Sequence, residues 1–524
     1  MKIHIREIEE HIKNEFKLYG KDIFLQVIIG LIAYFMMMSK NLVNDVDGLW
    51  HSSNFIAGDW EISLGRAFQR YADRARFGIV SEPFNSTLTL LLIAVSNTLI
   101  IKKLSIKNTL YRWVLYVIMI ANPIVCCSLT YCYTSINFGL AYFFSVLAFV
   151  YIQTEIKLKK QCVVGLLVSS CFLGVSMAFY QAYICVTSVL AVTMILKMLI
   201  KQENIKCILK YITFCIGTYI FGGLIYFSIT KVFLYRADVQ MSTYKGAANT
   251  DIFYMIKSLP ESIKHCYEQF RTYFFDLKCF SNLEFIEIVI GGLCIIYIGA
   301  ILIQIYKVFK NSLWHGFLFI VMILLLPVAS CSILLIAVGN SMTELMSMGM
   351  LLCVLLLGLV VPDDGKLGFV MKRIYFIILV SFMWFQLSAV ENDQLALKEG
   401  KTATITLTEN ILDSLCDEYN LDSEKVVAFV GIPADNDMFA KSEAYNMANG
   451  YARFGYWSTD ARNNRVSWSG VISNFLGTNL NLCSDMDYEK IVQLEQIREM
   501  PEYPDKGSIC IIEDIIVVKV SGNY

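Results

Sequence analysis

Charged residues are scarce in this sequence. Asp, Glu, Lys and Arg make up 17% of its 524 residues, whereas a soluble domain of ordinary composition is roughly 25% charged. Hydrophobic residues account for 56%, and the mean hydropathy is +0.54. The deficit is uneven, because stretches such as 24–38, 88–101 and 331–361 are apolar and nearly or wholly free of charge. This composition excludes an ordinary soluble protein.

Common signatures of soluble enzymes are missing as well. The sequence has no P-loop, no GxGxxG pattern and no HExxH motif, and its five histidines are scattered. The 16 cysteines lie mostly inside apolar runs, where a free cysteine behaves as a small hydrophobic residue. The remaining Cys416, Cys483 and Cys510 have no close spacing that would indicate a zinc site or a disulfide framework. We therefore expect no metal, no cofactor and no nucleic-acid partner.

Long apolar runs in series predict a polytopic α-helical membrane protein. A spanning helix needs about 20 mostly apolar residues, and about eleven such segments can be placed between residues 1 and 391. A signal peptide is not expected, because no small-residue cleavage site follows the first run. The predicted spans are 22–40, 86–101, 111–129, 134–153, 161–178, 183–200, 211–231, 285–306, 314–337, 341–361 and 374–391, and the third and fourth could shift around Asn122-Pro123.

Basic residues follow every even-numbered span, and the short loops after the third and fifth spans contain no Lys or Arg. Positive charge marks the cytoplasmic side, so we expect a cytoplasmic N-terminus and, with an odd number of spans, an extracytoplasmic C-terminal tail. The same reasoning places two long loops, about 41–85 and 232–284, on the outer side. The basic residues are Lys102, Lys103, Lys107, Lys157, Lys159, Lys160, Lys201, Lys206, Lys210, Lys307, Lys310, Lys366, Lys372 and Arg373.

The tail, residues 392–524, has a different composition. It contains 11 Lys and Arg against 21 Asp and Glu, so its net charge is -10, whereas the rest of the chain carries +9. Helical periodicity at 406–419, a buried strand at 425–431 and two strands joined by a tight turn at 509–520 predict a small α/β domain.

The first outer loop contains the most informative polar residues. Asp45 and Asp47 directly follow the first span, where a carboxylate beside hydrocarbon is costly and therefore a candidate for function. One of them could act as a general base that takes a proton from an attacking hydroxyl; a solvated loop end is the alternative. Residues 62–77 carry Arg66, Arg70, Arg74 and Arg76, which predicts an amphipathic helix that either anchors in lipid or binds phosphate.

Three motifs resemble one enzyme family. Asp47-Gly48-Leu49-Trp50 followed by 58–66 (GDWEISLGR), 179–184 (FYQAYI), and 392–431 resemble segments of the bacterial Gtr-type (type II) glucosyl transferases of the membrane GT-C class. The resemblance implies an inverting transfer of glucose, or a related hexose, from a polyprenyl-phosphate donor to a cell-surface polysaccharide. It further implies a bacterial cell membrane and a catalytic carboxylate in the first outer loop. A donor-synthesising glycosyltransferase and a flippase would act upstream.

On this basis we favour Asp47 as the base, with Asp45 second. Candidate donor-phosphate ligands are Arg66, Arg70 and Arg236, although an arginine at a span end is more often an anchor. A polysaccharide polymerase or a transporter or flippase for lipid-linked sugars remains an alternative, although no internal repeat supports a transporter. Candidate sugar or acceptor contacts are Trp50, Trp60, Glu61, Tyr180 and Gln181.

Overall fold

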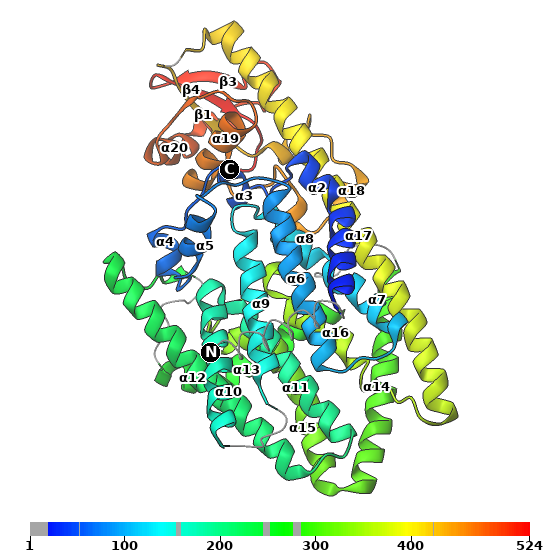
Figure 1. Cartoon of the computed structure of the whole chain (residues 1–524). Helices are drawn as coiled ribbons and strands as arrows, with labels where there is room; N and C mark the ends of the chain where they lie inside the picture. The colour runs from blue at the N-terminus through cyan, green and yellow to red at the C-terminus, as the bar shows by residue number, and fades with distance from the viewer. Residues whose placement is uncertain (1–18, 52, 154–158, 245–251, 276–284, 423) are drawn as a thin grey trace.

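The computed structural model describes residues 19–51, 53–153, 159–244, 252–275, 285–422 and 424–524, and most of them are helical (Figure 1). A helical segment over residues 19–33 leads into α2 (Phe35–Lys40). The longer helices that follow are α6 (Phe84–Lys103), α7 (Thr109–Ile120), α9 (Ser135–Tyr151), α10 (Lys159–Phe179), α11 (Ile184–Ile200), α12 (Ile205–Ala237), α13 (Ile252–Phe275), α14 (Ile286–Asn311), α15 (Leu313–Ser330), α16 (Met348–Leu357) and α17 (Gly365–Tyr419).

Eight helices among the described residues are long and apolar enough to cross a membrane. They coincide with eight of the predicted spans. The predicted spans 134–153 and 341–361 fall on the shorter apolar helices α9 and α16, and 22–40 falls on a helical segment with a turn at Tyr34. The chain is therefore a mostly helical protein with several apolar helices of membrane-spanning type, and the total of eleven spans stays a prediction.

The predicted span 111–129 is broken at Asn122-Pro123. Asn122 ends the first segment and caps α8 (Pro123–Thr130), because its Oδ1 accepts hydrogen bonds from the amides of Ile124 and Val125 at 3.0 and 3.1 Å. The buried Tyr34 hydroxyl bonds the carbonyl oxygens of Ile120 and Asn122 and the amide of Asn122, each at 3.1 Å. Away from water, backbone groups freed by a helix break need such a partner.

Tyr34→Phe is expected to lower the free energy of unfolding by about 1–3 kcal/mol, because it leaves buried backbone groups at this break without a partner. Thermal unfolding of the purified protein in detergent measures the loss. Tyr235→Phe is the matched control, because Tyr235 is 88% exposed. Equal midpoints for the two variants would contradict a stabilising role for the Tyr34 hydroxyl.

Helix α17 joins the apolar body, which precedes residue 365, to the C-terminal part, residues 420–524. Its 55 residues span about 80 Å at 1.5 Å per residue, more than twice the thickness of a hydrocarbon core. In Figure 1 it begins at the lower right beside α14 and ends at the top beside the sheet. The helix runs through residue 392 without interruption, so the division of the chain at residues 391 and 392 stays a prediction.

The C-terminal part contains a four-stranded sheet in the order β2-β1-β4-β3. Strand β1 (Val426–Val430) pairs in parallel with β2 (Asn481–Leu482) and β4 (Ile515–Lys519), whereas β3 (Ile509–Ile512) is antiparallel to β4. The tight turn between β3 and β4 places Glu513 and Asp514 at φ 48° and 66°, which suits a two-residue hairpin. The strands predicted at 425–431 and 509–520 are confirmed. Helices α18 (Glu443–Met447), α19 (Ala461–Asn474), α20 (Asp485–Val492) and α21 (Glu495–Glu499) complete this part.

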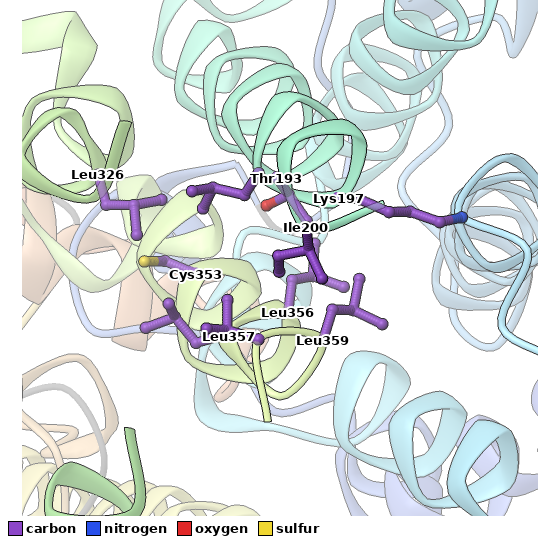
Figure 2. Close-up of a pocket in the computed structure, with 10 residues that line it drawn as sticks. Thr193, Lys197, Ile200, Leu326, Cys353, Leu356, Leu357 and Leu359 are labelled. Carbon is purple, nitrogen blue, oxygen red and sulfur yellow. The ribbon is translucent and has the colours of Figure 1, made fainter. Parts of the chain in front are cut away.

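Helices α11, α15 and α16 line a small cavity of about 10 Å³, shown in Figure 2. Its walls are mostly leucine and isoleucine side chains, and Lys197 extends away from them to donate a hydrogen bond to the Leu104 carbonyl. Apart from Thr193 and Lys197 its lining is apolar, which offers few partners to a polar substrate. We therefore assign it to imperfect packing between helices.

Candidate active site

The first loop is held tightly against the end of α8. Helix α3 (Asp47–Trp50) follows Asn44, whose Oδ1 accepts a hydrogen bond from the Gly48 amide at 2.7 Å. The backbone amide of Asn44 in turn donates to the Thr130 carbonyl at 3.2 Å. A Cβ at Gly48 would lie 2.6 Å from that same carbonyl oxygen, so only glycine fits there. These contacts fix the backbone that carries Asp45 and Asp47.

The prediction of a single amphipathic helix over 62–77 is wrong. The chain forms two short helices, α4 (Asp59–Ser63) and α5 (Gln69–Ala75), separated by a turn in which Gly65 has φ +77°. The Arg66 amide bonds the Glu61 carbonyl and the Gly65 amide bonds the Ile62 carbonyl, which is a Schellman helix end. Arg66 therefore leaves the helical face that it would have shared with Arg70 and Arg74.

The turn at Gly65 places Arg66 in a cavity with the 179–184 motif. The cavity encloses about 850 Å³ including its open mouth, and Arg66, Tyr180 and Gln181 all contribute to its lining. The Arg66 guanidinium lies over the Tyr180 ring, 4.9 Å from the ring centre. The Gln181 amide donates to the Leu64 carbonyl at 2.6 Å and to the Tyr226 hydroxyl at 2.8 Å. Two motifs more than 110 residues apart in sequence are thus joined directly.

The two long loops predicted for one side of the membrane also meet here. The Ser242 amide, in the segment after α12, donates to the Ser63 carbonyl at 2.9 Å, and the Trp60 and Tyr244 rings lie 5.7 Å apart. Tyr244 lines the cavity, which places Trp60 at its edge.

One polar atom of the cavity has no partner. Arg66 Nε is buried and makes no hydrogen bond to any residue that the structure describes. A buried guanidinium nitrogen without an acceptor is costly, and no residue that the structure describes offsets this cost. Arginine suits phosphate because its planar fork can donate two parallel hydrogen bonds. Among the predicted arginines, Arg66 is accordingly the strongest candidate for an anion ligand.

Two tyrosines connect this cavity with the first loop. Burial raises the pKa of Tyr133 well above its usual range; the negative charge of Asp47 raises it further, and the positive charge of Arg66 opposes the rise. Burial, Cys127 and Asp47 likewise raise the pKa of Tyr131, to which Tyr180 also contributes. Asp47 and Arg66 thus both act electrostatically on one side chain, Tyr133. The first loop and the Arg66 turn therefore belong to the same region of the structure.

The C-terminal part covers the other carboxylate of the loop. Burial raises the pKa of Asp45 to about 8, the backbone amides of Asp45 and Tyr456 oppose this rise, and nearby Asp47 adds to it. The same part is fastened to α3, because Trp50 Nε1 donates to Ser467 Oγ at 3.3 Å and the Asn474 amide donates to the Leu49 carbonyl at 2.9 Å. A carboxyl with this pKa is mostly protonated at pH 7.

The raised pKa of Asp45 predicts a pH-dependent effect of Asp45→Asn. The folded protein keeps a proton that the unfolded chain loses near pH 4, so this carboxyl lowers stability progressively as the pH rises from about 4 to about 8. Asp45→Asn removes the titration, and its melting temperature relative to the parent protein is expected to rise across this range. Thermal unfolding in detergent at a series of pH values tests this. A constant difference between the two proteins would show that the carboxyl is already ionised in the folded state.

A buried ion pair between Asp73 and Arg76 stabilises the first loop. Asp73 is fully buried. Its carboxylate accepts hydrogen bonds at 2.9–3.0 Å from the backbone amide of Ala57, the guanidinium of Arg76 and the side-chain amide of Asn137. Arg76 also donates to the carbonyl of Tyr133. The pair therefore ties α5 to the segment between α8 and α9 that contains Tyr133.

The other predicted contacts lie elsewhere or have structural partners. Glu61 Oε2 caps α4 by accepting from the Gly58 amide at 2.7 Å, and Trp50 bonds α19 as described. Arg70 pairs with Asp59 at 2.8 Å, and the exposed Arg236 does not line the cavity. Sugar, acceptor or phosphate binding by these side chains stays a prediction.

Several residues of the cavity were not predicted from the sequence. Tyr226 lies inside α12, Tyr244 follows it, and Asn340 follows α15. Tyr226 carried a weak signal, because a hydroxyl within an apolar span needs a hydrogen-bond partner. Nothing in the sequence alone linked Asn340 to the Gly65 turn.

Comparison with family models decides the class of protein. The model of the glucosyl transferase GtrII family matches residues 34–357, more than half of the chain. The chain belongs to the glucosyl transferase GtrII family. Comparison with curated proteins and with solved structures gives no match.

The GtrII match contains the residues that form the site. It includes the first loop, the Arg66 turn and the 179–184 motif, and it ends with α16. Helix α17 and the sheet lie outside the matched residues, as does the predicted family segment at 392–431. Membership thus confirms the resemblance expected from the first two motifs and indicates glucosyl transfer in general.

Proposed function

We propose that this protein transfers glucose, or a related hexose, from a polyprenyl-phosphate donor to a cell-surface polysaccharide on the outer face of a bacterial cell membrane. The observation that carries the proposal is that Arg66 lines a cavity together with Tyr180 and Gln181, and that its Nε has no acceptor among the described residues. The charges of Asp47 and Arg66 both act on Tyr133, which supports a common site. An acid-base group and an anion ligand are what transfer from a phosphate-linked sugar requires.

In the proposed step, an acceptor hydroxyl attacks the anomeric carbon of the donor. The new carbon–oxygen bond forms as the bond to the phosphate oxygen breaks, so the configuration at the anomeric carbon inverts. Asp47 takes the proton of the hydroxyl. The bonding electrons leave with the polyprenyl phosphate, and Arg66 stabilises the charge on that leaving group.

The cavity chemistry suits a lipid-linked donor. Alongside Arg66 and Gln181, its lining contains Met241, Met255, Ile333, Ile336 and Met346, flexible or branched apolar side chains. A nucleotide sugar would need a polar pocket for its base and ribose. We propose a cytoplasmic N-terminus with the loops, the site and the C-terminal part outside, which matches the outer-leaflet position of such a donor.

The proposal is tested with the purified protein in liposomes. We expect label from radiolabelled polyprenyl-phosphate glucose, but not from UDP-glucose, to appear in surface polysaccharide isolated from the same bacterium. A cysteine introduced at position 392 should react with an impermeant thiol reagent added outside intact cells. Transfer from UDP-glucose alone, or labelling only after the membrane is opened, would contradict the donor or the orientation.

Arg66→Ala is expected to raise the KM for the donor by roughly tenfold to a hundredfold, because a hydrogen bond to a charged group contributes about 1.5–3 kcal/mol. Initial rates at varied donor concentration measure the change. Arg70→Ala is the matched control, because Arg70 bonds Asp59 and the Ala57 carbonyl and does not line the cavity. A larger effect for Arg70→Ala, or a change confined to acceptor affinity, would contradict this role for Arg66.

A further inference from the structure

A second large hollow lies at the end of the molecule where α17 begins (Figure 1). It encloses about 2240 Å³ including its open mouth and lies between α7, α14, α17 and the segments that follow α6 and α16. We call it the basal groove. Its polar residues belong to the loops expected to be cytoplasmic, whereas the candidate active site lies beside α3 and α4. The groove is therefore independent of the proposed glucosyl transfer.

The basal groove has an excess of positive charge. Four of its lining residues are cationic, and two, Asp363 and Asp364, are acidic. Lys307 pairs with Asp364 at 2.6 Å, and Lys372 pairs with Asp363 at 2.9 Å. The two remaining cations are Lys107 and Arg373, and neither has a carboxylate partner among the residues that the structure describes. The groove thus offers a net charge of +2 at its lining.

These two cations come from different segments of the groove lining. Lys107 precedes α7, and Arg373 lies in the third turn of α17, where its guanidinium covers the Phe369 ring at 4.0 Å. This contact restrains the arginine side chain. A restrained guanidinium that lines the same groove as a lysine is suited to a phosphate.

The basal groove also has apolar walls, and it is open to the outside. Leu110 on α7 and Ile377 on α17 line it and are 63% and 65% exposed. The Tyr111 and Tyr375 hydroxyls lie 3.3 Å apart and hold the two helices at a constant separation. A free anion would not need the apolar walls, and a neutral lipid would not need the unpaired cations. Both features together match a molecule with an anionic head and hydrocarbon chains.

We propose that the basal groove binds an anionic phospholipid. Its phosphate would lie between Lys107 and Arg373, and its acyl chains would follow Leu110 and Ile377 along α7 and α17. Basic pockets between spanning helices on the cytoplasmic side are suited to acidic headgroups. Because α17 continues to the C-terminal part, the bound lipid would stabilise the base of the helix that supports this part.

The test measures lipid binding by native mass spectrometry. Purified protein is titrated with phosphatidylglycerol, phosphatidylcholine or a polyprenyl phosphate. We expect the double variant Lys107→Gln with Arg373→Gln to bind phosphatidylglycerol roughly tenfold or more weakly than the parent protein, since each cation near a headgroup contributes about 1 kcal/mol. Phosphatidylcholine binding should be weak and equal in both proteins. Thermal unfolding checks that the variant is folded.

The matched control is Lys206→Gln with Lys210→Gln, which removes two exposed cations from the first turns of α12 outside the groove. This control should leave phosphatidylglycerol binding unchanged. Equal weakening in both double variants would overturn the proposal, because it would reflect surface charge in general. Displacement of the lipid by excess inorganic phosphate, or tighter binding of polyprenyl phosphate than of phosphatidylglycerol, would overturn the assigned occupant.

Discussion

Asp47→Asn is expected to lower kcat for glucosyl transfer by roughly a hundredfold to ten-thousandfold, the range that a positioned general base contributes. The amide keeps the size of the carboxylate but cannot accept the proton of the attacking hydroxyl. Because Asp47 is proposed to act on the acceptor, the KM for the donor should change little. Initial rates with saturating donor and acceptor in liposomes measure both quantities.

Asp45→Asn is the matched comparison, since the two residues lie two positions apart. Burial beneath the C-terminal part raises the pKa of Asp45 to about 8, so the group is already mostly neutral at pH 7. Its replacement by the neutral amide should therefore reduce kcat by less than about tenfold. If Asp45→Asn abolished transfer while Asp47→Asn left it intact, the assignment of the base would be reversed. Both variants must first be shown to insert into the membrane and to unfold cooperatively.

Asp73→Ala is expected to lower the free energy of unfolding by about 3–5 kcal/mol, the usual effect of removing one partner of a buried ion pair. The substitution leaves the Arg76 guanidinium, whose side chain is 7% exposed, without its carboxylate. The Ala57 and Asn137 amides lose an acceptor in the same step. Thermal and denaturant unfolding of the purified protein measure the change.

Activity should fall together with stability in Asp73→Ala. Arg76 bonds the Tyr133 carbonyl, and Asp47 acts electrostatically on Tyr133, so a displaced arginine should disturb the surroundings of Asp47. Asp59→Ala is the control, because the Asp59–Arg70 pair is largely exposed and such pairs contribute about 0–1 kcal/mol. A loss of stability no larger than that of Asp59→Ala would show that the buried pair is not the support of this loop.

The C-terminal part contacts both the first loop and, through α17, the rest of the chain. Its contacts with α3 and the backbone amide at Tyr456 surround Asp45, while α17 connects it to the opposite end of the apolar body. A part that lies over the first loop is in a position to affect how an acceptor reaches Asp47. Its sequence lies outside the GtrII match.

The sequence by itself determined the class of protein, most of the helices and the strands of the tail. Long apolar runs can be satisfied only by helices in a membrane, and a continuous run of apolar, β-branched residues suits a buried strand such as β1. The motifs at 47–50 and 58–66 also indicated the family, because a short motif can be recognised from its own residues alone. These conclusions depend only on residues that are close together in the sequence.

Only the tertiary structure decided which residues act together. The turn at Gly65 directs Arg66 away from Arg70 and towards Tyr180, although the spacing of the arginines had predicted one shared helical face. The different environments of Asp45 and Asp47 likewise depend on Tyr456 and Tyr133, which lie far from them in sequence. Burial and charge at a side chain are set by whatever packs around it. Helical periodicity contains no record of such distant contacts, which is why the site, unlike the spans, required the fold.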